Sequence, residues 1–127
     1  MKRHFEGLGI SLTKNFGIPI GHDRKKKHRF DLGSDDPAIL VECKANTWTK
    51  SGKRPSAKIR GMNEVMFHFH LAPSNYRKIL FVLKHLRPQG KGDSLGTHYV
   101  RTQGHLIGEG IEVWQFDLTN GVAEKLR

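Results

Sequence analysis

Two short apolar segments separated by an amphipathic one constrain the fold of this chain more than any other feature. Residues 38–45 (AILVECKA) and 78–85 (KILFVLKH) have the apolar character of strands that are covered on both faces of a sheet. Between them, apolar residues at spacings of three and four predict a helix from Ser56 to about Pro73. The apolar positions of this helix are Ile59, Met62, Val65, Met66 and Phe69. A strand, a helix and a second strand in this order predict a right-handed crossover between parallel strands.

The segments before and after this unit complete an α/β pattern. The turn sequence GSDDP at residues 33–37 separates two extended segments and predicts a hairpin, and Ser56 is a candidate N-cap. The other expected elements are a helical turn at 2–8, strands at 9–21, 30–32, 38–48 and 111–118, a glycine-rich loop at 89–93 and a helix at 94–107. The expected fold class is therefore α/β, with a mixed central sheet flanked by helices.

The length and charge of the chain indicate a single domain with a polyanionic partner. A chain of 127 residues is too short for two good cores, so residues 1–127 are expected to form one domain. The composition, 36% hydrophobic and 27% charged, is that of an ordinary globular protein. Because 22 Lys and Arg residues stand against 12 Asp and Glu residues, nucleic acid is the first candidate partner and an anionic membrane surface the second.

Other features of the sequence favour the cytoplasm. The first residues, MKRHFEGLG, are basic but are not followed by an apolar segment, so we do not expect a secretory signal. No segment approaches the roughly 18 apolar residues that a membrane span requires. The single cysteine, Cys43, excludes an intramolecular disulfide and fits a reducing compartment.

Two ionic residues interrupt the first apolar segment. Because side chains alternate along a strand, Glu42 and Lys44 point to one face, whereas Cys43 points to the other face as a structural thiol. Leaving either ion unpaired in a buried strand would cost on the order of several kcal/mol. The hairpin brings Asp31 opposite Val41 or Glu42, within reach of the Glu42 side chain, whereas the aspartates of the turn lie too far away. Two carboxylates and one ammonium group are therefore expected on one sheet face.

This combination of side chains suits phosphoryl chemistry. Two neighbouring carboxylates repel each other, and a divalent cation relieves that repulsion. Oxygen ligands suit Mg²⁺, which takes one or two carboxylates and completes its coordination with water and phosphate oxygens. Lys44 beside the metal would position or deprotonate the attacking water and stabilise charge in the transition state. In so basic a chain, the phosphoryl group is expected to be a nucleic-acid phosphodiester.

The spacing of these residues resembles a known nuclease motif. Asp31, ten intervening residues and then the sequence ECK ending at Lys44 resemble the PD-(D/E)XK nuclease superfamily, the restriction-endonuclease-like fold. The resemblance covers roughly residues 18–85 and implies an αβββαβ core. It implies that Asp31 and Glu42 bind Mg²⁺, for which Mn²⁺ substitutes, and that Lys44 assists the water. It also makes Glu6 the candidate for an additional acidic residue, whereas Phe30 stands where the family often has proline.

The leading hypothesis is therefore a Mg²⁺-dependent nuclease that hydrolyses DNA phosphodiester bonds as an endonuclease. The resemblance further implies that such a small enzyme works as a homodimer, so that two sites address two strands. Two alternatives stay open: a non-catalytic basic module that binds DNA or RNA, and a ribonuclease of the same fold. The binding module would show salt-sensitive binding without metal dependence.

Several basic residues are candidates for contacts with the nucleic-acid backbone. They flank the ECK sequence or lie in the segment DRKKKHR: Lys25, Lys26, Lys27, Lys50, Lys53, Arg54, Lys58 and Arg60. The eight histidines show no metal-site spacing, and His68 and His70 lie about 200° apart around a helix axis. We expect single histidines at the surface or facing nucleic acid. For Trp48, core packing is favoured over base stacking.

Overall fold

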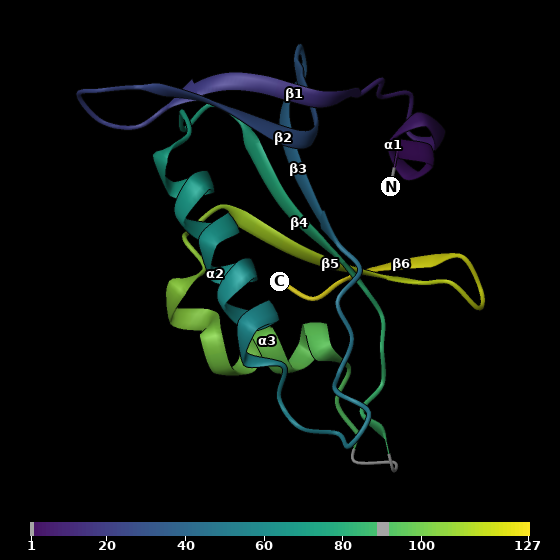
Figure 1. Cartoon of the computed structure of the whole chain (residues 1–127). Coiled ribbons are helices and arrows are strands. Elements are labelled where there is room, and N and C mark those ends of the chain that lie inside the picture. Colours follow the sequence, from purple (N-terminus) through teal and green to yellow (C-terminus); the bar gives the residue numbers. More distant parts are fainter. Residues whose placement is uncertain (1, 89–91) are drawn as a thin grey trace.

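A computed structural model of the chain describes residues 2–88 and 92–127 (Figure 1). Within these residues the chain forms a six-stranded mixed sheet and three α-helices. The elements are α1 (Lys2–Gly7), β1 (Thr13–Ile20), β2 (Lys26–Asp35), β3 (Ala38–Lys44), α2 (Ser56–Leu71), β4 (Arg77–Leu83), α3 (Leu95–Gln103), the 3₁₀ turn η2 (Gly104–Leu106), β5 (Ile111–Asp117) and β6 (Val122–Lys125). The α/β class expected from the sequence is confirmed.

The strands lie in the sheet in the order in which they occur in the sequence. β1, β2 and β3 pair antiparallel and form the expected meander. β3, β4 and β5 pair parallel, which confirms the expected strand–helix–strand crossover through α2. β6 then pairs antiparallel with β5 at the far edge. The carboxyl ends of β3 and β4 therefore lie at the same end of the sheet, where the chain enters α2 and α3.

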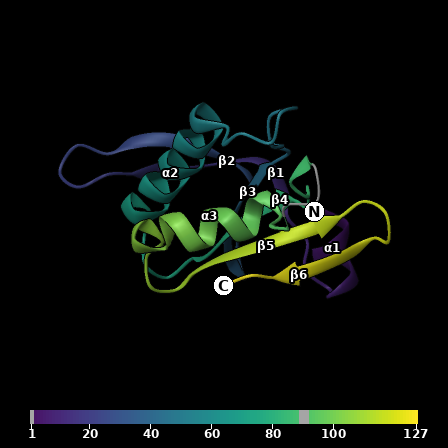
Figure 2. The ribbon, with the colours of Figure 1, turned by 90° about the horizontal axis from the view of Figure 1, so that it is seen from below.

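Helices cover the two faces of the sheet unequally. α2 and α3 pack on one face, as Figures 1 and 2 show, over a core that contains Phe30, Leu40 and Leu80 of the strands. α1 lies on the opposite side and contributes Phe5 to a smaller core that includes Val41. Neighbouring residues of β3 thus point into different cores, as the alternation of side chains along a strand requires.

The sequence pattern locates the helices well but misassigns one cap. All five apolar positions predicted for α2 are buried, and the helix ends at Leu71, just before the expected proline. Ser56, however, is the first residue of α2; Pro55 occupies the N-cap position, and no side chain caps the helix there. The prediction for Ser56 is therefore wrong. At α3, by contrast, the Ser94 hydroxyl accepts a hydrogen bond from the Thr97 amide at 3.2 Å.

Three strand predictions need correction. β3 ends at Lys44 instead of residue 48, because the chain leaves the sheet there, although Trp48 is buried in the larger core as expected. The strand β6 is not foreseen at all, since its side chains are mostly exposed and show no apolar alternation. Leu118 is 72% exposed, so it does not share the packed face that Trp114 and Phe116 line.

Two further predictions concern loops. Lys26 and Lys27 belong to β2, so part of the basic segment DRKKKHR is strand and not hairpin loop. The glycine-rich loop expected at residues 89–93 falls largely outside the described residues. Among the helices that the structure describes, none has the length and apolarity needed to cross a membrane.

Candidate active site

The strands β2 and β3 separate beside Asp31. Their backbone pairing runs from Asp35 opposite Ala38 to Leu32 opposite Val41. One residue further, side chains replace the backbone ladder. The Asp31 carboxylate accepts a hydrogen bond from the Cys43 amide at 2.7 Å, and the Glu42 carboxylate accepts one from the Asp31 amide at 3.3 Å. These two bonds confirm that Asp31 lies beside Glu42, as the hairpin register predicts.

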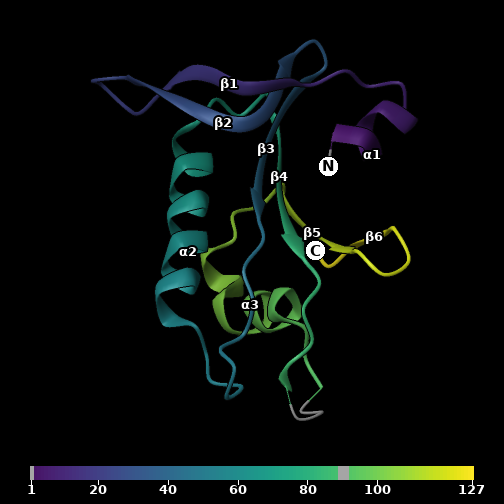
Figure 3. The ribbon, with the colours of Figure 1, turned by 45° about the vertical axis from the view of Figure 1, so that its right-hand side comes forward.

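A change of strand direction explains why the strands part there. Phe30 is buried in the core under α2, whereas Leu32, two residues later, is buried in the core under α1. In a regular strand, residues two apart share a face, so the alternation of β2 is broken at Asp31. Phe30 and Leu32 pair with Phe16 and Lys14 of β1. Asn15, between these two partners, has a positive φ of 53°. Figure 3 shows β1 and β2 crossing the end of β3 as a result. The two carboxylates thus bind backbone N–H groups that would otherwise lose their partners at this point.

Burial and a neighbouring charge act on Glu42 in the same direction. The Glu42 side chain lies on the sheet face under α2, and the residue is only 8% exposed. Its burial, followed by the nearby Asp31 charge, raises the pKa of the Glu42 carboxyl from 4.5 to about 7; Lys44 and the Asp31 amide oppose this rise with smaller effects. A group that is so reluctant to carry a charge alone is a natural ligand for a cation.

Lys44 shares a cavity with Glu42, as alternation along β3 predicts. The cavity has a volume of about 180 Å³ and lies between β3 and α2. Its lining residues are His28, Glu42, Lys44, Gly61, Glu64, Val65 and His68. We call it the Glu42 cavity. It joins a carboxylate, an ammonium group and open space for a ligand at one place on the sheet.

Two histidines of this cavity were not among the predicted site residues. The rings of His28 on β2 and His68 on α2 lie with their centroids 4.0 Å apart. His28 Nε2 is 3.8 Å from Glu42 Oε1 and is buried without a hydrogen-bond partner in the described part of the chain. Burial, followed by the charge of His68, lowers the pKa of the His28 imidazole. The His28 side chain is 27% exposed and faces the cavity, so it does not contradict the expectation of histidines at the surface or facing nucleic acid, whereas His98, only 9% exposed, does.

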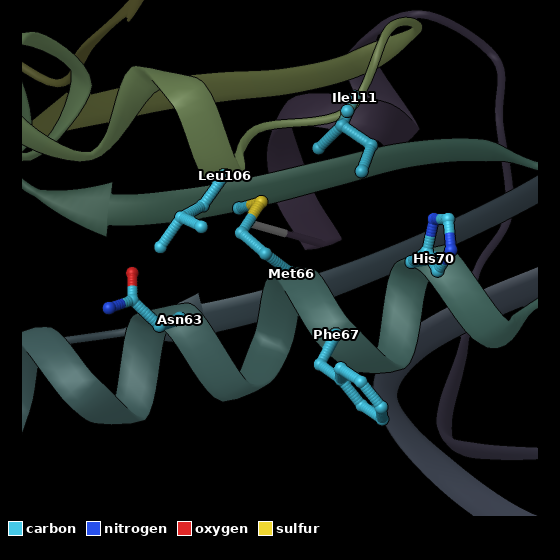
Figure 4. Close-up of a pocket in the computed structure, with 7 residues that line it drawn as sticks. Asn63, Met66, Phe67, His70, Leu106 and Ile111 are labelled. Atoms are coloured by element: carbon cyan, nitrogen blue, oxygen red, sulfur yellow. The ribbon is translucent and has the colours of Figure 1, made fainter.

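Glu64 on α2 was also missed. Its carboxylate lies 3.9 Å from His68 Nε2, one helical turn away, and lines the Glu42 cavity from the helix side. The signal that would have found Glu64 and His68 is weak. Both lie near the buried residue Val65 on α2, but only the packing of α2 on the sheet brings them to Glu42. His70 lines a different pocket from His68 (Figure 4).

The remaining acidic candidates lie elsewhere. Glu6 is exposed on α1, which packs against the sheet face opposite to the Glu42 cavity. Asp35 lies at the tip of the hairpin, where it accepts a hydrogen bond from the Tyr76 hydroxyl. As expected, Cys43 packs against the smaller core on the far face, and burial raises the pKa of its thiol to about 12. Cys43 is therefore no nucleophile at neutral pH.

The predicted nucleic-acid contacts form two exposed groups at the two ends of α2. One group, at the start of the helix, comprises Lys50, Lys53, Arg54, Lys58 and Arg60. The other, on the β1–β2 hairpin, comprises Lys25, Lys26 and Lys27. The Gly21 amide donates a hydrogen bond to the Leu71 carbonyl at 3.2 Å, which ties this hairpin to the end of α2. The Glu42 cavity lies along α2 between the two basic groups.

The donor set at the site suits a hard cation. In the part of the chain that the structure describes, no three His, Cys, Asp or Glu side chains gather closely enough to hold a metal by themselves. Asp31 and Glu42 nevertheless supply two neighbouring carboxylates; burial, followed by the Asp31 charge, raises the pKa of Glu42. Mg²⁺ commonly binds through one or two carboxylates and takes its other ligands from water and substrate phosphate. The residues present therefore fit Mg²⁺ better than a metal that needs an all-protein shell.

Comparison of the chain with protein-family models, with curated proteins and with solved structures gives no match. The interpretation of the site therefore rests on its own residues and geometry.

Proposed function

We propose that the chain is a Mg²⁺-dependent nuclease of the PD-(D/E)XK type that hydrolyses DNA phosphodiester bonds as an endonuclease. The observation that carries this proposal is the pairing of Asp31 and Glu42 across the point where β2 and β3 part. Lys44 stands two residues along the same strand and lines the same cavity as Glu42. Hydrogen bonds to the two backbone N–H groups account for acceptors at positions 31 and 42, but they do not require ionisable groups or an ammonium group beside them.

Each of the three residues has a distinct role in this proposal. Asp31 and Glu42 would hold the Mg²⁺ ion, or Mn²⁺ in its place, through their carboxylate oxygens. When bound, such an ion polarises a phosphoryl group and lowers the pKa of a coordinated water. Lys44 would orient the attacking water by hydrogen bonding and stabilise the negative charge that develops on the phosphoryl oxygens.

Charge on the surface supports a nucleic acid as the substrate. The two basic groups lie at the ends of α2, on either side of the Glu42 cavity. A backbone that contacts both groups would pass the cavity, so its phosphates would come within reach of Lys44. The net charge of +10 adds a long-range attraction for any polyanion.

A second candidate function is a non-catalytic module that binds DNA or RNA through the same surface. The observation that favours it is the lack of three gathered metal-ligating side chains among the described residues. In that case, burial of the Glu42 carboxyl would destabilise the fold without contributing to catalysis. A ribonuclease with the same site is the third candidate.

A plasmid cleavage assay tests the proposal. Purified protein is incubated with supercoiled DNA in Mg²⁺, in Mn²⁺ and in EDTA, and a parallel panel contains linear, branched and single-stranded DNA and RNA. We expect nicking or cutting with either metal and none in EDTA. Glu42→Gln and Asp31→Asn, which keep the shape of each side chain, should abolish cleavage.

The control for these variants is Glu109→Gln, which removes an exposed carboxylate outside the site. It should cleave like the wild type. Metal-independent DNA binding without cleavage of any substrate would favour the binding module, and cleavage of RNA alone would favour the ribonuclease. Wild-type cleavage by both site variants would reject the site.

A further inference from the structure

A large aromatic side chain is exposed beside the candidate active site. Phe67 on α2 is 61% exposed, although its neighbours Met66 and Phe69 are buried in the core. In Figure 4 its ring points away from Leu106 and Ile111, although Phe67 also lines the pocket drawn there with them. Single exposed apolar side chains are common on protein surfaces, so this ring becomes a candidate for contact with a ligand only through the charged cavity that it lines.

A second cavity adjoins the Glu42 cavity at this ring. It has a volume of about 350 Å³, and Phe67 lines it together with three basic residues of the β1–β2 hairpin: Arg24, Lys26 and Lys27. We call it the Phe67 cavity. His28 and His68 line both cavities, so the two spaces lie side by side along α2 and β2.

The cations of the Phe67 cavity are available to a ligand. Arg24, Lys26 and Lys27 are exposed, and none of them forms an ion pair with a residue that the structure describes. Their charges point to an anion, and the ring of Phe67 points to a flat apolar group. A nucleotide combines both, because its base stacks on aromatic side chains while its phosphate binds cations.

The required base must be unpaired. In a fully paired duplex each base is stacked between its neighbours, so it reaches a protein ring only by leaving the helix, which costs on the order of a few kcal/mol. A nucleotide in a single strand, a loop or a branch avoids this cost. A site of this kind would therefore bind DNA with unpaired nucleotides in preference to uniform duplex.

We propose that the Phe67 cavity is a subsite for an unpaired nucleotide next to the phosphodiester that reacts in the Glu42 cavity. Phe67 stacks on the base, and Arg24, Lys26 and Lys27 bind the flanking phosphates. This inference rests on the proposed nuclease function and specifies its substrate as DNA that contains unpaired nucleotides. The alternative is that Phe67 contacts a second copy of the chain. Three cations without ion-pair partners surround the ring, and a second copy also has a net charge of +10, so this contact is less favourable.

Removal of the ring from the protein and of the base from the DNA, each alone and both together, isolates the stacking contact. Binding is measured by fluorescence anisotropy in EDTA, so that no cleavage occurs, with a duplex that contains a loop of unpaired thymidines. A second duplex carries abasic residues in the same loop. We expect the wild type to prefer the thymidine loop by about tenfold, within the range for stacking of one base on one aromatic ring. Phe67→Ala should lose this preference, and Phe67→Tyr should retain it.

Controls separate stacking from other effects. Leu8→Ala removes an apolar side chain that is also 61% exposed but follows α1, which packs on the opposite face, and it should leave the preference unchanged. An unchanged preference in Phe67→Ala overturns the proposal. The proposal is also overturned if Phe67→Ala changes the oligomeric state, measured by sedimentation, but keeps the wild-type preference. In that case the ring contacts a second copy of the chain.

Failure of the subsite and failure of the proposed nuclease function give different results. If the wild type shows the loop preference but cleaves no DNA in Mg²⁺, the nuclease is rejected and nucleotide binding stands. If the wild type cleaves DNA but Phe67→Ala keeps the wild-type preference, the nuclease stands and the subsite is rejected.

Discussion

Glu42 shows how one residue connects folding stability with function. The sheet holds this carboxyl in a buried position next to the charge of Asp31, and together they raise its pKa from 4.5 to about 7. In the absence of a metal, the ionised group therefore opposes folding. A cation that binds both carboxylates would stabilise the ionised form of Glu42, which the protein alone disfavours. Binding of the cation would therefore also stabilise the folded protein.

This cost predicts a specific pH dependence of stability. Because the folded pKa of Glu42 lies above its unfolded value, its contribution to stability is fully present below pH 4.5 and is lost as the pH rises through about 7. The loss amounts to about 3 kcal/mol. Glu42→Gln should lack this loss, so in EDTA at pH 8 it should be more stable than the wild type.

Urea denaturation of both proteins at pH 5 and pH 8 measures the difference. Glu109→Gln serves as the control for the removal of one negative charge and should follow the wild type. Equal pH profiles for the wild type and Glu42→Gln would contradict the environment described for this carboxyl.

At this scale, the sequence locates part of the site. Alternation along the ECK strand puts Glu42 and Lys44 on one face, and the hairpin register puts Asp31 beside Glu42, because both are local consequences of strand geometry. Asp31 itself is not among the residues that line the Glu42 cavity.

His28, Glu64 and His68 were not among the predicted site residues. Glu64 and His68 reach the cavity only because α2 packs on this sheet face at a particular angle and height, and residue spacing does not encode that packing. His28 lies on β2, two residues before Phe30 and on the same face, so strand alternation could have located it.

At the scale of elements, close contact between β1 and β2 keeps the bend at Asp31 in place. Gly33 of β2 lies under the ring of Phe16 of β1, which leaves no space for a side chain. A Cβ atom at Gly33 would lie 2.4 Å from Phe16 Cδ2 and 2.8 Å from Phe16 Cβ. The ring and its Cβ would have to move, so the pairing of the two strands depends on this glycine.

Gly33→Ala should therefore destabilise the protein by about 1–3 kcal/mol, the usual cost of overpacking. The matched control is Gly61→Ala in α2, where an added Cβ meets no atom within 4 Å. That change should be neutral or stabilising by up to about 1 kcal/mol, since alanine favours helix. Thermal unfolding distinguishes the two. A neutral Gly33→Ala would show that β1 and β2 are not packed as described.

The neighbouring strands β4 and β5 are joined by a second set of contacts. The Arg77 guanidinium of β4 donates hydrogen bonds of 2.6 and 2.9 Å to the Glu112 carboxylate of β5, and the Trp114 indole donates one of 3.0 Å. The bond from Arg77 is the main cause that lowers the pKa of Glu112.

Arg77→Met should therefore cost about 1 kcal/mol, because Arg77 is partly exposed and solvent screens the pair. The cost should be present above the unfolded pKa of Glu112 and should vanish as the pH falls below its folded value. Urea denaturation at pH 7 and pH 3 tests the prediction, and an equal difference between wild type and variant at both pH values would contradict it.

Prediction of secondary structure from the sequence succeeds for some elements and fails for others. The helix α2 follows from apolar spacing, because its buried side is continuous. α3 carries a weaker pattern, since Gly96 and His98 are buried beside Leu95 and Tyr99. β6 has no such pattern, since it lies at the sheet edge with mostly exposed side chains, and only pairing with β5 makes it a strand. The end of β3 at Lys44 is likewise set by tertiary structure: the chain leaves the sheet to bury Trp48, whose amide donates to His85 Nδ1 at 3.1 Å.

For the whole molecule, the arrangement of charge predicts how DNA binding responds to salt. The hairpin group and the group at the start of α2 lie on either side of the Glu42 cavity, so both should contact the same backbone. Replacement of Lys25, Lys26 and Lys27 by Gln should reduce the slope of log K against log salt concentration by about one for each phosphate that these lysines neutralise.

Filter binding or anisotropy from 50 to 300 mM salt, roughly the range over which such interactions weaken, measures this slope. Replacement of Lys50, Lys53 and Arg54 should have a comparable effect. If only one of the two triple variants alters the slope, the backbone does not pass between the two groups as described.

The central claim is that Asp31, Glu42 and Lys44 form a hydrolytic centre, and Lys44→Met tests it most directly. The substitution keeps the aliphatic stem and removes the ammonium group, so the fold and the carboxylates should remain. The measurement is the rate of plasmid nicking in Mg²⁺ at protein concentrations that saturate the DNA, compared with the wild type. We predict affinity within a few-fold of the wild type and cleavage at least about 100-fold slower, the usual scale for the loss of such a group. Nicking at the wild-type rate by Lys44→Met would contradict the account.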